Sequence, residues 1–517
     1  MSILFTVVLI FFIIKIVRDG LFYTWLWQIK EYRPDRMVSH LKNDRGMKDV
    51  GISYLLAVIL IVIVLIFPDH MPIISFAVAA FFSFSVIHAI GEIINRSIKR
   101  PKPTLKIAAI VLGTVFMLIP FAVLFTNSDE ISKNKLLLLA YILMPSMVSA
   151  VVLAVNPIFD FQKKRILEKA AAKMRSLKKV RTIGITGSFG KTSTKEFLYT
   201  ILSRKFKVVK TEGNNNTNIG VAYTVLNKVS DDYDYFICEM GAYKIGEIKE
   251  MCDIATPEIG ILTGINEQHI ELFGSIENTI KAKLELIESL PKHGLAIVNE
   301  KLKNKKEGDR SKVKSINYFS INLAKNIKVY SDYSEFEYKG KIFRLNLPGM
   351  HYIENLMSVI MASEHLGMAL DEIRDAISEI KPTEYMIRRS AGINNSVFID
   401  DSYSANPDGV IAALDYIEEA YPDHKKIIVF PGFIELGNES EKIHMDVFDR
   451  LRNKFNVAFI LDTKYSKLYT GNGCKFIFEK DFNKAANMLK NDLDKNTVVL
   501  FESRGAGAVM RKLKNFK

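Results

Sequence analysis

The chain has 517 residues, of which 49% are hydrophobic, and its formal net charge is +13. The hydrophobic share is high for a purely soluble enzyme, and the surplus is concentrated near the N-terminus. The three cysteines are widely scattered with no C-x-x-C pair, which suggests neither a disulfide framework nor a zinc site and fits a reducing compartment. A basic balance fits nucleic acid, an anionic membrane or a solvated surface. Because the apolar front accounts for much of the basic charge, we expect a lipid bilayer and no nucleic acid as partner.

The first third of the chain carries apolar runs, each approaching the roughly 20 residues that cross a bilayer core. They are Met1–Val17, Gly51–Pro68, Met71–Ile94, Leu105–Thr126 and Leu136–Val155. No small-residue cleavage site follows the first run, so we expect a retained anchor. Pro120 and Pro145 interrupt two of the runs, and one or two runs could be buried or re-entrant instead. None of the runs shows a paired charge, which argues against a transporter.

Lysine and arginine are concentrated in residues 18–48, 96–106 and 163–181, whereas residues 69–70 and 127–135 are poorer in positive charge. Under the positive-inside rule this pattern predicts a multi-pass cell-membrane protein whose long C-terminal part lies in the cytoplasm.

From Thr182 onward, short apolar β-rich runs alternate with helical patterns. The predicted strands are Thr182–Thr186, Phe236–Met240, Ile259–Thr263, Ala296–Asn299, Ile427–Phe430, Val457–Leu461 and Val498–Phe501. This alternation favours βαβ units and an α/β fold with mainly parallel sheets. We therefore expect a membrane region of about five helices at 1–165, a central domain at 166–382 and a C-terminal domain at 383–517.

One glycine-rich turn follows the first of these strands. The stretch Thr182–Phe197, TIGITGSFGKTSTKEF, runs from strand to turn to helix, with the helix expected to begin near Lys191. Backbone N–H groups of such a turn hold phosphates, the lysine neutralises the β/γ charge, and Thr192 can offer a hydroxyl to Mg²⁺. The residues expected to hold ATP are Gly187, Ser188, Gly190, Lys191, Thr192 and Ser193. The alternative is an ordinary strand-turn-helix.

The short glycine spacing T-G-x-x-G-K-T resembles the Mur ligase family of ATP-dependent amide ligases, and within it the D-alanyl-D-alanine-adding branch. Further motifs follow in family order: TEGNNNTNIGV (Thr211–Val221), EMGAYKIGEI (Glu239–Ile248), Thr263–Ile287, LPGMHYIEN (Leu347–Asn355), DDSYSANPDGV (Asp400–Val410) and PGFIELG (Pro431–Gly437). The resemblance covers about Arg181 to the end. It implies a P-loop central domain, a Rossmann-like C-terminal domain, and peptide-bond formation through an acyl phosphate in cell-wall precursor synthesis.

The resemblance also implies a pair of magnesium ions. It makes Glu239 a metal ligand, where the alternative is a helix-capping acid, and His269 a ligand of the second ion, where the alternative is a structural histidine. It makes Lys283, chosen over Lys281 by its sequence context, a carbamylated lysine that holds the second ion; alone it would read as a solvated lysine. Oxygen-rich ligands of this kind suit Mg²⁺.

The remaining site residues are carried over from the same resemblance. Asn299, His351 and Asn355 resemble adenine-side contacts, although a helix cap and a polar surface pair would explain them too. Either Arg388 or Arg389 resembles the arginine that reaches the γ-phosphate. Asp401 resembles a ribose contact. The residues expected to act in catalysis are Lys191, His269, Lys283 and Arg388.

The sequence departs from the family at several points. Membrane-like sequence stands where the family carries a soluble domain for the UDP-sugar precursor, and Phe501-Glu502-Ser503-Arg504 replaces the usual Lys-Gly-Ser-Arg. The first hypothesis is a ligase that adds D-Ala-D-Ala or a related amine to a UDP-muramoyl-peptide. The alternative acceptor is a lipid-linked or polymeric carboxylate, such as polyglutamate or a surface glycan. From a different class, the chain could be a nucleotide-binding membrane scaffold.

Overall fold

The computed structural model describes the chain with short gaps, and it separates into two compact units. The described residues are 3–42, 44–66, 71–94, 98–213, 215–266, 270–303, 312–403, 406–433, 436, 439–464, 466–468 and 473–515. We call Met1–Lys164 the helical unit and Arg165–Lys517 the α/β unit. The boundary between them falls inside one long helix, α6.

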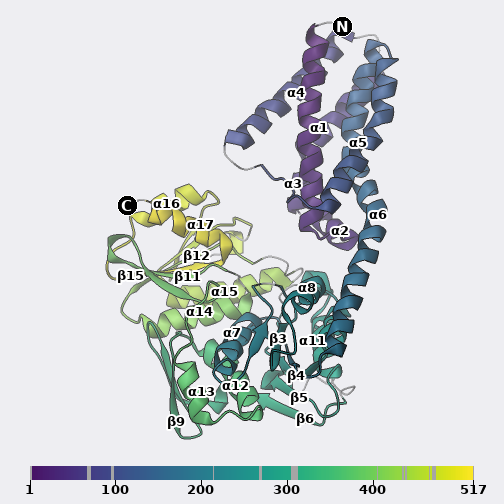
Figure 1. The fold of residues 1–517 in the computed structure, drawn as a ribbon. Coiled ribbons are helices and arrows are strands. Elements are labelled where there is room, and N and C mark those ends of the chain that lie inside the picture. Colours follow the sequence, from purple (N-terminus) through teal and green to yellow (C-terminus); the bar gives the residue numbers. More distant parts are fainter. Residues whose placement is uncertain are drawn as a thin grey trace. The chain divides into compact units, whose positions relative to one another are not determined.

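The helical unit consists of helices that follow the apolar runs (Figure 1). They are α1 (Ile3–Ile29), α2 (Pro34–Lys42), α3 (Asp44–Ile66), α4 (Met71–Ile94), α5 (Leu105–Thr126) and α6 (Glu130–Ser176). By length and composition, three stretches of the described residues could cross a membrane: Ser75–Ile94, Leu105–Thr126 and Ser132–Ser176. Tyr54–Ile66 is a shorter apolar stretch. The five crossings and the topology stay a prediction. Pro120 and Pro145 do not end a helix, because α5 and α6 continue through them.

The expectation that the apolar runs carry no paired charge is wrong. Lys15 pairs with Asp19 one turn further along α1, with 3.0 Å between Nζ and Oδ2. Arg18 donates to both carboxylate oxygens of Glu92 in α4, over 2.9 and 2.6 Å. These pairs were not predicted because α1 extends twelve residues beyond the apolar run that ends at Val17, and because Glu92 lies 74 residues from Arg18 in the sequence.

The α/β unit begins with a six-stranded sheet, and all its neighbouring strands are parallel. Its order is β2 (Val208–Lys210), β3 (Tyr235–Glu239), β1 (Arg181–Thr186), β4 (Pro257–Leu262), β5 (Leu295–Asn299) and β6 (Ser315–Phe319). The helices around it are α7 (Lys191–Leu202), α8 (Asn218–Lys228), α9 (Glu247–Ala255), α10 (Ile270–Phe273), α11 (Ile276–Glu288), α12 (Met350–His365) and α13 (Leu370–Ile377). The predicted parallel sheet is confirmed, and the predicted strands match within two residues.

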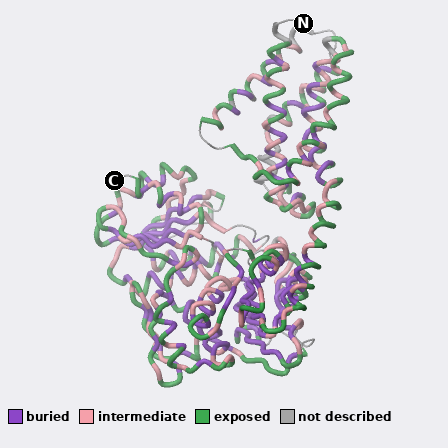
Figure 2. The backbone as a smooth tube through the Cα atoms, in the orientation of Figure 1, coloured by how far each residue is buried: buried purple, intermediate pink, exposed green. Residues whose placement is uncertain are grey.

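Alternate residues of these strands face two different cores. Ile237 packs with α7, α12 and α13, whereas its neighbours Phe236 and Cys238 pack with α8, α9, α11 and the end of α6. The strands are therefore covered on both faces, as their almost continuously apolar sequences require. Figure 2 shows the buried strands at the centre of the unit.

A second six-stranded sheet follows, with the order β10 (Arg388–Ala391), β11 (Val397–Asp401), β15 (Thr497–Glu502), β12 (Lys425–Phe430), β13 (Val457–Ile460) and β14 (Lys475–Phe478). It is parallel except for the pairing of β10 with β11. Its helices are α14 (Pro407–Ala420), α15 (Ser440–Lys454), α16 (Phe482–Lys490) and α17 (Ser503–Lys514). A small antiparallel sheet of β7 (Lys325–Val329), β8 (Ser334–Tyr338) and β9 (Lys341–Leu345) lies between the two in sequence and was not predicted.

Candidate active site

The glycine-rich turn connects β1 to α7, and α7 begins at Lys191 as predicted. Two glycines make the turn possible. Gly187 has φ of +152°, and a Cβ there would lie 2.1 Å from Oγ1 of Thr263. Gly190 has φ of +76° and lies so close to Asn355 that a Cβ would approach its Oδ1 to 2.5 Å. The turn therefore holds the first N–H groups of α7 at the carboxyl edge of the sheet, where a phosphate is favoured.

Lys191 folds back over this turn. Its partly buried ammonium donates to the carbonyl oxygens of Gly187 at 2.8 Å and Ser188 at 3.0 Å. Burial lowers the pKa of Lys191, and the negative charge of Glu239 offsets part of that effect. Because these hydrogen bonds already fix the position of the ammonium group, it can neutralise the charge of a bound phosphate with little further loss of side-chain freedom.

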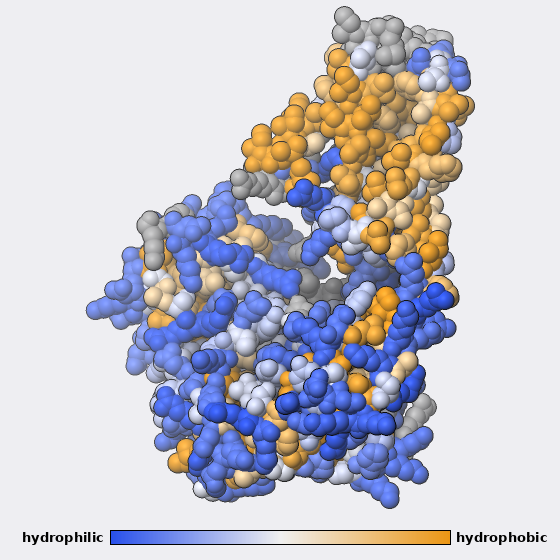
Figure 3. Space-filling view, in the orientation of Figure 1, coloured by the Kyte–Doolittle hydropathy of each residue, from blue (hydrophilic) through white to orange (hydrophobic). Residues whose placement is uncertain are grey.

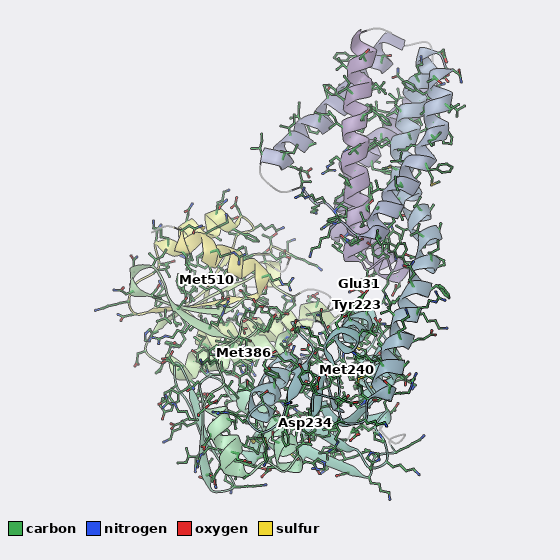
Figure 4. All side chains as sticks on the ribbon, in the orientation of Figure 1. Glu31, Tyr223, Asp234, Met240, Met386 and Met510 are labelled. Atoms are coloured by element: carbon green, nitrogen blue, oxygen red, sulfur yellow. The ribbon has the colours of Figure 1, made fainter. Side chains whose placement is uncertain are left out.

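Glu239 ends β3 beside this helix start. Its Oε1 accepts from the hydroxyl of Thr192 at 3.2 Å and from the side-chain amide of Asn216 at 2.9 Å. Its Oε2 lies 3.0 Å from Nζ of Lys195 but accepts no hydrogen bond of good geometry from the described residues. Met240, labelled in Figure 4, follows Glu239 directly and locates this end of β3.

The donor set at Glu239 fits Mg²⁺. The carboxylate is 1% exposed, and the ammonium group of Lys195, 3.0 Å from Oε2, offsets part of its charge; a carboxylate oxygen is also a ligand that Mg²⁺ prefers. The Thr192 hydroxyl supplies a second oxygen beside it. The described residues contain no group of three or more His, Cys, Asp or Glu placed to hold a metal ion. A magnesium site here would therefore need ligands of other types, including phosphate oxygens.

Lys283 lies on α11 and faces a pocket beside the phosphate turn. The pocket is lined by Gly187, Ser188, Lys191, Asn216, Gly241, Ala242, Tyr243, Phe273 and Lys283. Lys283 is 3% exposed, whereas Lys281 is exposed to solvent. Burial, and then the positive charge of Lys191, lower the pKa of Lys283 to about 7. About half of the amine is therefore uncharged at neutral pH, and the uncharged amine is the nucleophilic form of a lysine.

His269 lies outside the described residues, so its predicted role as a metal ligand stays a prediction. Asn299 ends β5 and donates to the Thr263 carbonyl at 2.9 Å, next to the turn. His351 is the second residue of α12, and burial lowers its pKa to about 4, so its ring is neutral at pH 7. Nδ1 of His351 accepts no hydrogen bond from the described residues. Asn355, one turn further, contacts Gly190.

The loop after β4 contacts the start of α14 in the C-terminal segment. Asn266 donates through its side-chain amide to Asn406 at 3.2 Å and to Asp408 at 2.7 Å. Arg388 pairs with Asp400 on the neighbouring strand at 2.8 Å, while Arg389 pairs with Asp332 at 3.0 Å. The structure therefore brings Lys191, Thr192, Glu239, Lys283 and Asn355 together, and holds both candidate arginines in ion pairs outside that group.

Sequence reasoning assigned no role to two side chains at this site. Lys195 is fully buried, lies 3.0 Å from Glu239 and donates to the carbonyl of Gly213 at 2.9 Å. Its position four residues after Lys191 on α7 placed it on the same helix face, which was a usable signal. Asn216, inside the asparagine-rich motif, gave no signal that separated it from its neighbours Asn215 and Thr217.

A glycine-lined turn, a helix-initiating lysine and hydroxyl, and an acid at the end of the next strand define a P-loop nucleotide-binding α/β protein. Two family profiles match the chain: "Mur ligase middle domain" at residues 185–363 and "Mur ligase, glutamate ligase domain" at residues 386–505. The chain belongs to the Mur ligase family.

The two sequence relatives described next carry the same enzyme name. The UDP-N-acetylmuramoyl-tripeptide--D-alanyl-D-alanine ligase of Escherichia coli is 34% identical over 54% of this chain and 63% of the relative. The enzyme of the same name from Rickettsia prowazekii is 31% identical over 60% of this chain and 70% of the relative. The chain thus spans less than two thirds of the first relative's length. Among solved structures, MurF of Acinetobacter baumannii has a TM-score of 0.61 at 24% identity, over 68% of this chain and 80% of its own. MurF of Thermotoga maritima in complex with ADP has a TM-score of 0.60 at 25% identity, over 69% of this chain and 85% of its own.

Proposed function

We propose that this protein is an ATP-dependent amide ligase of cell-wall precursor synthesis, and that it adds D-alanyl-D-alanine to a UDP-muramoyl-tripeptide. The enzyme name that its relatives carry supports the assignment of these two substrates. The observation that carries the reaction class is the pocket that Lys191 and Lys283 line together, beside the hydrogen-bonded pair of Thr192 and the buried Glu239. A protein that only binds a nucleotide would not need a buried carboxylate and a buried lysine of lowered pKa beside the same phosphate turn.

The reaction needs an activated carboxylate. An oxygen of the acceptor carboxylate attacks the γ-phosphorus, and ADP leaves with the electron pair of the broken P–O bond. The amine nitrogen then attacks the acyl carbon, loses a proton and displaces inorganic phosphate. Lys191 and the start of α7 hold the phosphates and stabilise the charge that develops on them. Catalysis by this chain is therefore largely positioning and charge neutralisation.

We propose that Thr192 and Glu239 hold one Mg²⁺ and that His269 and Lys283 hold a second. Magnesium would neutralise the phosphate oxygens during the transfer. Lys283 would act as a carbamate, formed when its neutral amine takes up carbon dioxide and releases a proton, so that a cation becomes an oxygen ligand. Its burial and its pKa of about 7 support this assignment. Removing bicarbonate should then lower activity, and restoring it should recover activity.

We propose a cell-membrane location with the α/β unit in the cytoplasm. The helical unit exposes large apolar side chains, for example Phe116 at 73% and Leu112 at 70%. Exposed apolar surface on this scale marks a membrane or protein contact. The expected arrangement of basic loops supports the orientation.

A second candidate acceptor follows from the same helical unit. The helices of residues 3–164 precede the profile match at residue 185, so the acceptor could be presented at the membrane as a lipid-linked muramoyl-peptide or a polymeric carboxylate. The amide chemistry would be unchanged, and only the carrier of the carboxylate would differ.

Acceptor-dependent ADP release by the full-length protein in detergent micelles tests these candidates. The assay compares UDP-muramoyl-tripeptide, its lipid-linked counterpart and polyglutamate, each with and without D-Ala-D-Ala. The proposal predicts that release requires both UDP-muramoyl-tripeptide and the dipeptide. Release with the lipid-linked acceptor alone would favour the second candidate, and ATP binding without any turnover would favour a scaffold.

A further inference from the structure

One loop of the helical unit concentrates positive charge. Residues 98–104, here called the basic loop, lie between α4 and α5 in the sequence, and no acidic residue occurs between Glu92 and Asp129. Lys99, Arg100 and Lys102 of the loop are all exposed. The side chains of Arg100 and Lys102 make no hydrogen bond or ion pair with the described residues. The loop therefore presents cations that its own segment does not neutralise.

The end of α1 holds the basic loop in place. Gln28 donates through its side-chain amide to the carbonyl of Lys102 at 3.0 Å and accepts from the N–H of Lys102 at 2.7 Å. Pro101 and Pro103 restrict the backbone on either side of Lys102. Thr104 then caps the start of α5. The backbone that carries the basic side chains is therefore ordered by contacts within the helical unit.

Aromatic side chains at the end of α1 contact the basic residues. Nζ of Lys99 lies 5.1 Å from the ring centroid of Trp25 and 5.4 Å from that of Phe22. Nζ of Lys106, at the start of α5, lies 4.1 Å from the ring centroid of Tyr32. Tryptophan and tyrosine gather at the headgroup level of a bilayer, because their rings are apolar at one end and polar at the other. Cations stacked on these rings would therefore lie at the depth of lipid phosphate groups.

The acidic side chains of the surrounding helices are engaged by other cations. Those of α1, α2 and α4 form ion pairs, Asp19 and Glu92 with Arg18 and Asp35 with Arg33. In α6, the negative charge of Asp160 acts on Lys106. An anion from outside the protein can therefore approach the basic loop without displacing one of these carboxylates.

Apolar side chains flank the basic residues and indicate what kind of anion fits. Ile98, just before Lys99, is 42% exposed, and Leu105, just after the loop, is 85% exposed. A free phosphate ion gains nothing from these two side chains. A phospholipid places its acyl chains against them and its phosphate against the cations between them. The combination of charge and apolar surface thus favours a lipid over a soluble anion.

We propose that the basic loop and the aromatic end of α1 form a binding site for acidic phospholipids. Arg100 and Lys102 donate to the phosphate oxygens of the headgroup, and Lys99, stacked on Trp25, adds its charge beside them. The acyl chains lie along Leu105 and the neighbouring apolar surface. This inference rests on the proposed membrane location and goes beyond it, because it assigns the lipid class and the residues that select it. A bilayer contact made by apolar surface alone would show no preference for headgroup charge.

Quenching of tryptophan fluorescence tests the site, because Trp25 and Trp27 are the only tryptophans of the chain. The full-length protein is reconstituted into phosphatidylcholine vesicles that contain a rising fraction of brominated phosphatidylglycerol or brominated phosphatidylcholine. Bromine on the acyl chains quenches a ring that it touches, so the two titrations give the relative affinity. The wild type should prefer the acidic lipid about fivefold at low salt, the value of about one basic residue at an anionic surface. High salt should reduce this preference, because exposed charges are screened.

Variants separate the charge of the loop from its shape. The triple variant Lys99→Gln, Arg100→Gln and Lys102→Gln should lose the preference and still be quenched by brominated phosphatidylcholine. The triple variant Lys99→Arg, Arg100→Lys and Lys102→Arg keeps the charge and should keep the fivefold preference. Lys133→Gln with Lys135→Gln is the control for cations elsewhere in the unit. These two lysines lie near the start of α6, about 33 Å from the loop along α5, and the control should behave as the wild type.

Equal quenching of the wild type by the two brominated lipids would overturn the lipid site and leave the membrane location standing. Equal preferences in the two triple variants would overturn it too, since the charge of the loop would then play no part. Loss of the preference on addition of inorganic phosphate at constant ionic strength would mean a site for the free ion instead. Quenching by neither lipid would contradict the proposed membrane location itself.

Discussion

The helical unit and the α/β unit place their large apolar side chains in opposite environments. In the α/β unit, Phe197, Phe236 and Phe430 are fully buried between sheets and helices. In the helical unit, Phe116 and Leu112 of α5 are largely exposed, and Figure 3 shows apolar residues over much of its visible face. The polar groups are reversed too, because Lys15 and Asp19 are buried and paired inside the helical unit. This difference fits the membrane location proposed for the helical unit.

The largest expected effect comes from truncating one large aromatic side chain in each unit and comparing the two losses of stability. Phe197→Ala should lower the free energy of unfolding by about 4 kcal/mol, because it removes a fully buried ring and leaves a cavity. Phe116→Ala should change it by less than about 0.5 kcal/mol in detergent, since its ring is 73% exposed. Urea unfolding of the full-length protein measures both. Equal losses would mean that α5 packs against protein rather than lipid.

A smaller effect is expected from the charges inside the helical unit. A double-mutant cycle of Arg18→Ala and Glu92→Ala should give a coupling energy of about 1–2 kcal/mol, because the pair is bidentate and only about a quarter exposed. The pair Arg33–Asp35, whose aspartate is 64% exposed, is the matched control and should couple by less than about 0.5 kcal/mol. Thermal unfolding in detergent reports both cycles. Similar values for the two pairs would contradict a dry interior between α1 and α4.

The smallest expected effect is a pH dependence in the α/β unit. The folded state raises the pKa of Asp401 from 3.8 to about 7, so the folded state favours the protonated acid. The stability from this group is complete below about pH 4 and is lost as pH rises through 7. Asp401→Asn should therefore flatten the fall in stability between pH 4 and pH 7. Thermal unfolding across this range checks it, and parallel curves for variant and wild type would contradict it.

Much of the fold could be predicted from sequence because the strands of the parallel sheets are short, apolar and bounded by turns. The strand expected at Thr182–Thr186 is β1 at Arg181–Thr186, and the helix start at Lys191 is confirmed. The antiparallel sheet of β7–β9 was not predicted, although SEFEY alternates polar and apolar residues as a half-buried strand does, because its strands lack the continuous apolar runs by which the parallel strands were recognised. Such strands are determined by pairing partners that a local pattern does not contain.

The phosphate turn could be predicted because its chemistry is local, with glycines, lysine and threonine adjacent in sequence. The convergence of Glu239 and Lys283 on that turn depends on the order of β3, β1 and β4 in the sheet, which came only with the family resemblance. The pairing of Asp401 with Glu502 joins residues about a hundred positions apart and depends on β15 lying next to β11. The departure at Glu502 was visible in the sequence, but its partner was not.

In the proposed reaction, the turn beginning at Gly187 holds the ATP that converts a carboxylate into an acyl phosphate. Trapping with hydroxylamine tests it directly, because the trap replaces the amine substrate and converts an acyl phosphate into a stable hydroxamate. With ATP, Mg²⁺ and UDP-muramoyl-tripeptide, the full-length protein should form hydroxamate. Lys191→Ala should reduce this rate by about a thousandfold, as expected for the loss of a major charge-stabilising group. Lys205→Ala, which removes an exposed pair at the other end of α7, should leave it unchanged. Hydroxamate formation that persists in Lys191→Ala, or that is absent from the wild type, would contradict the account.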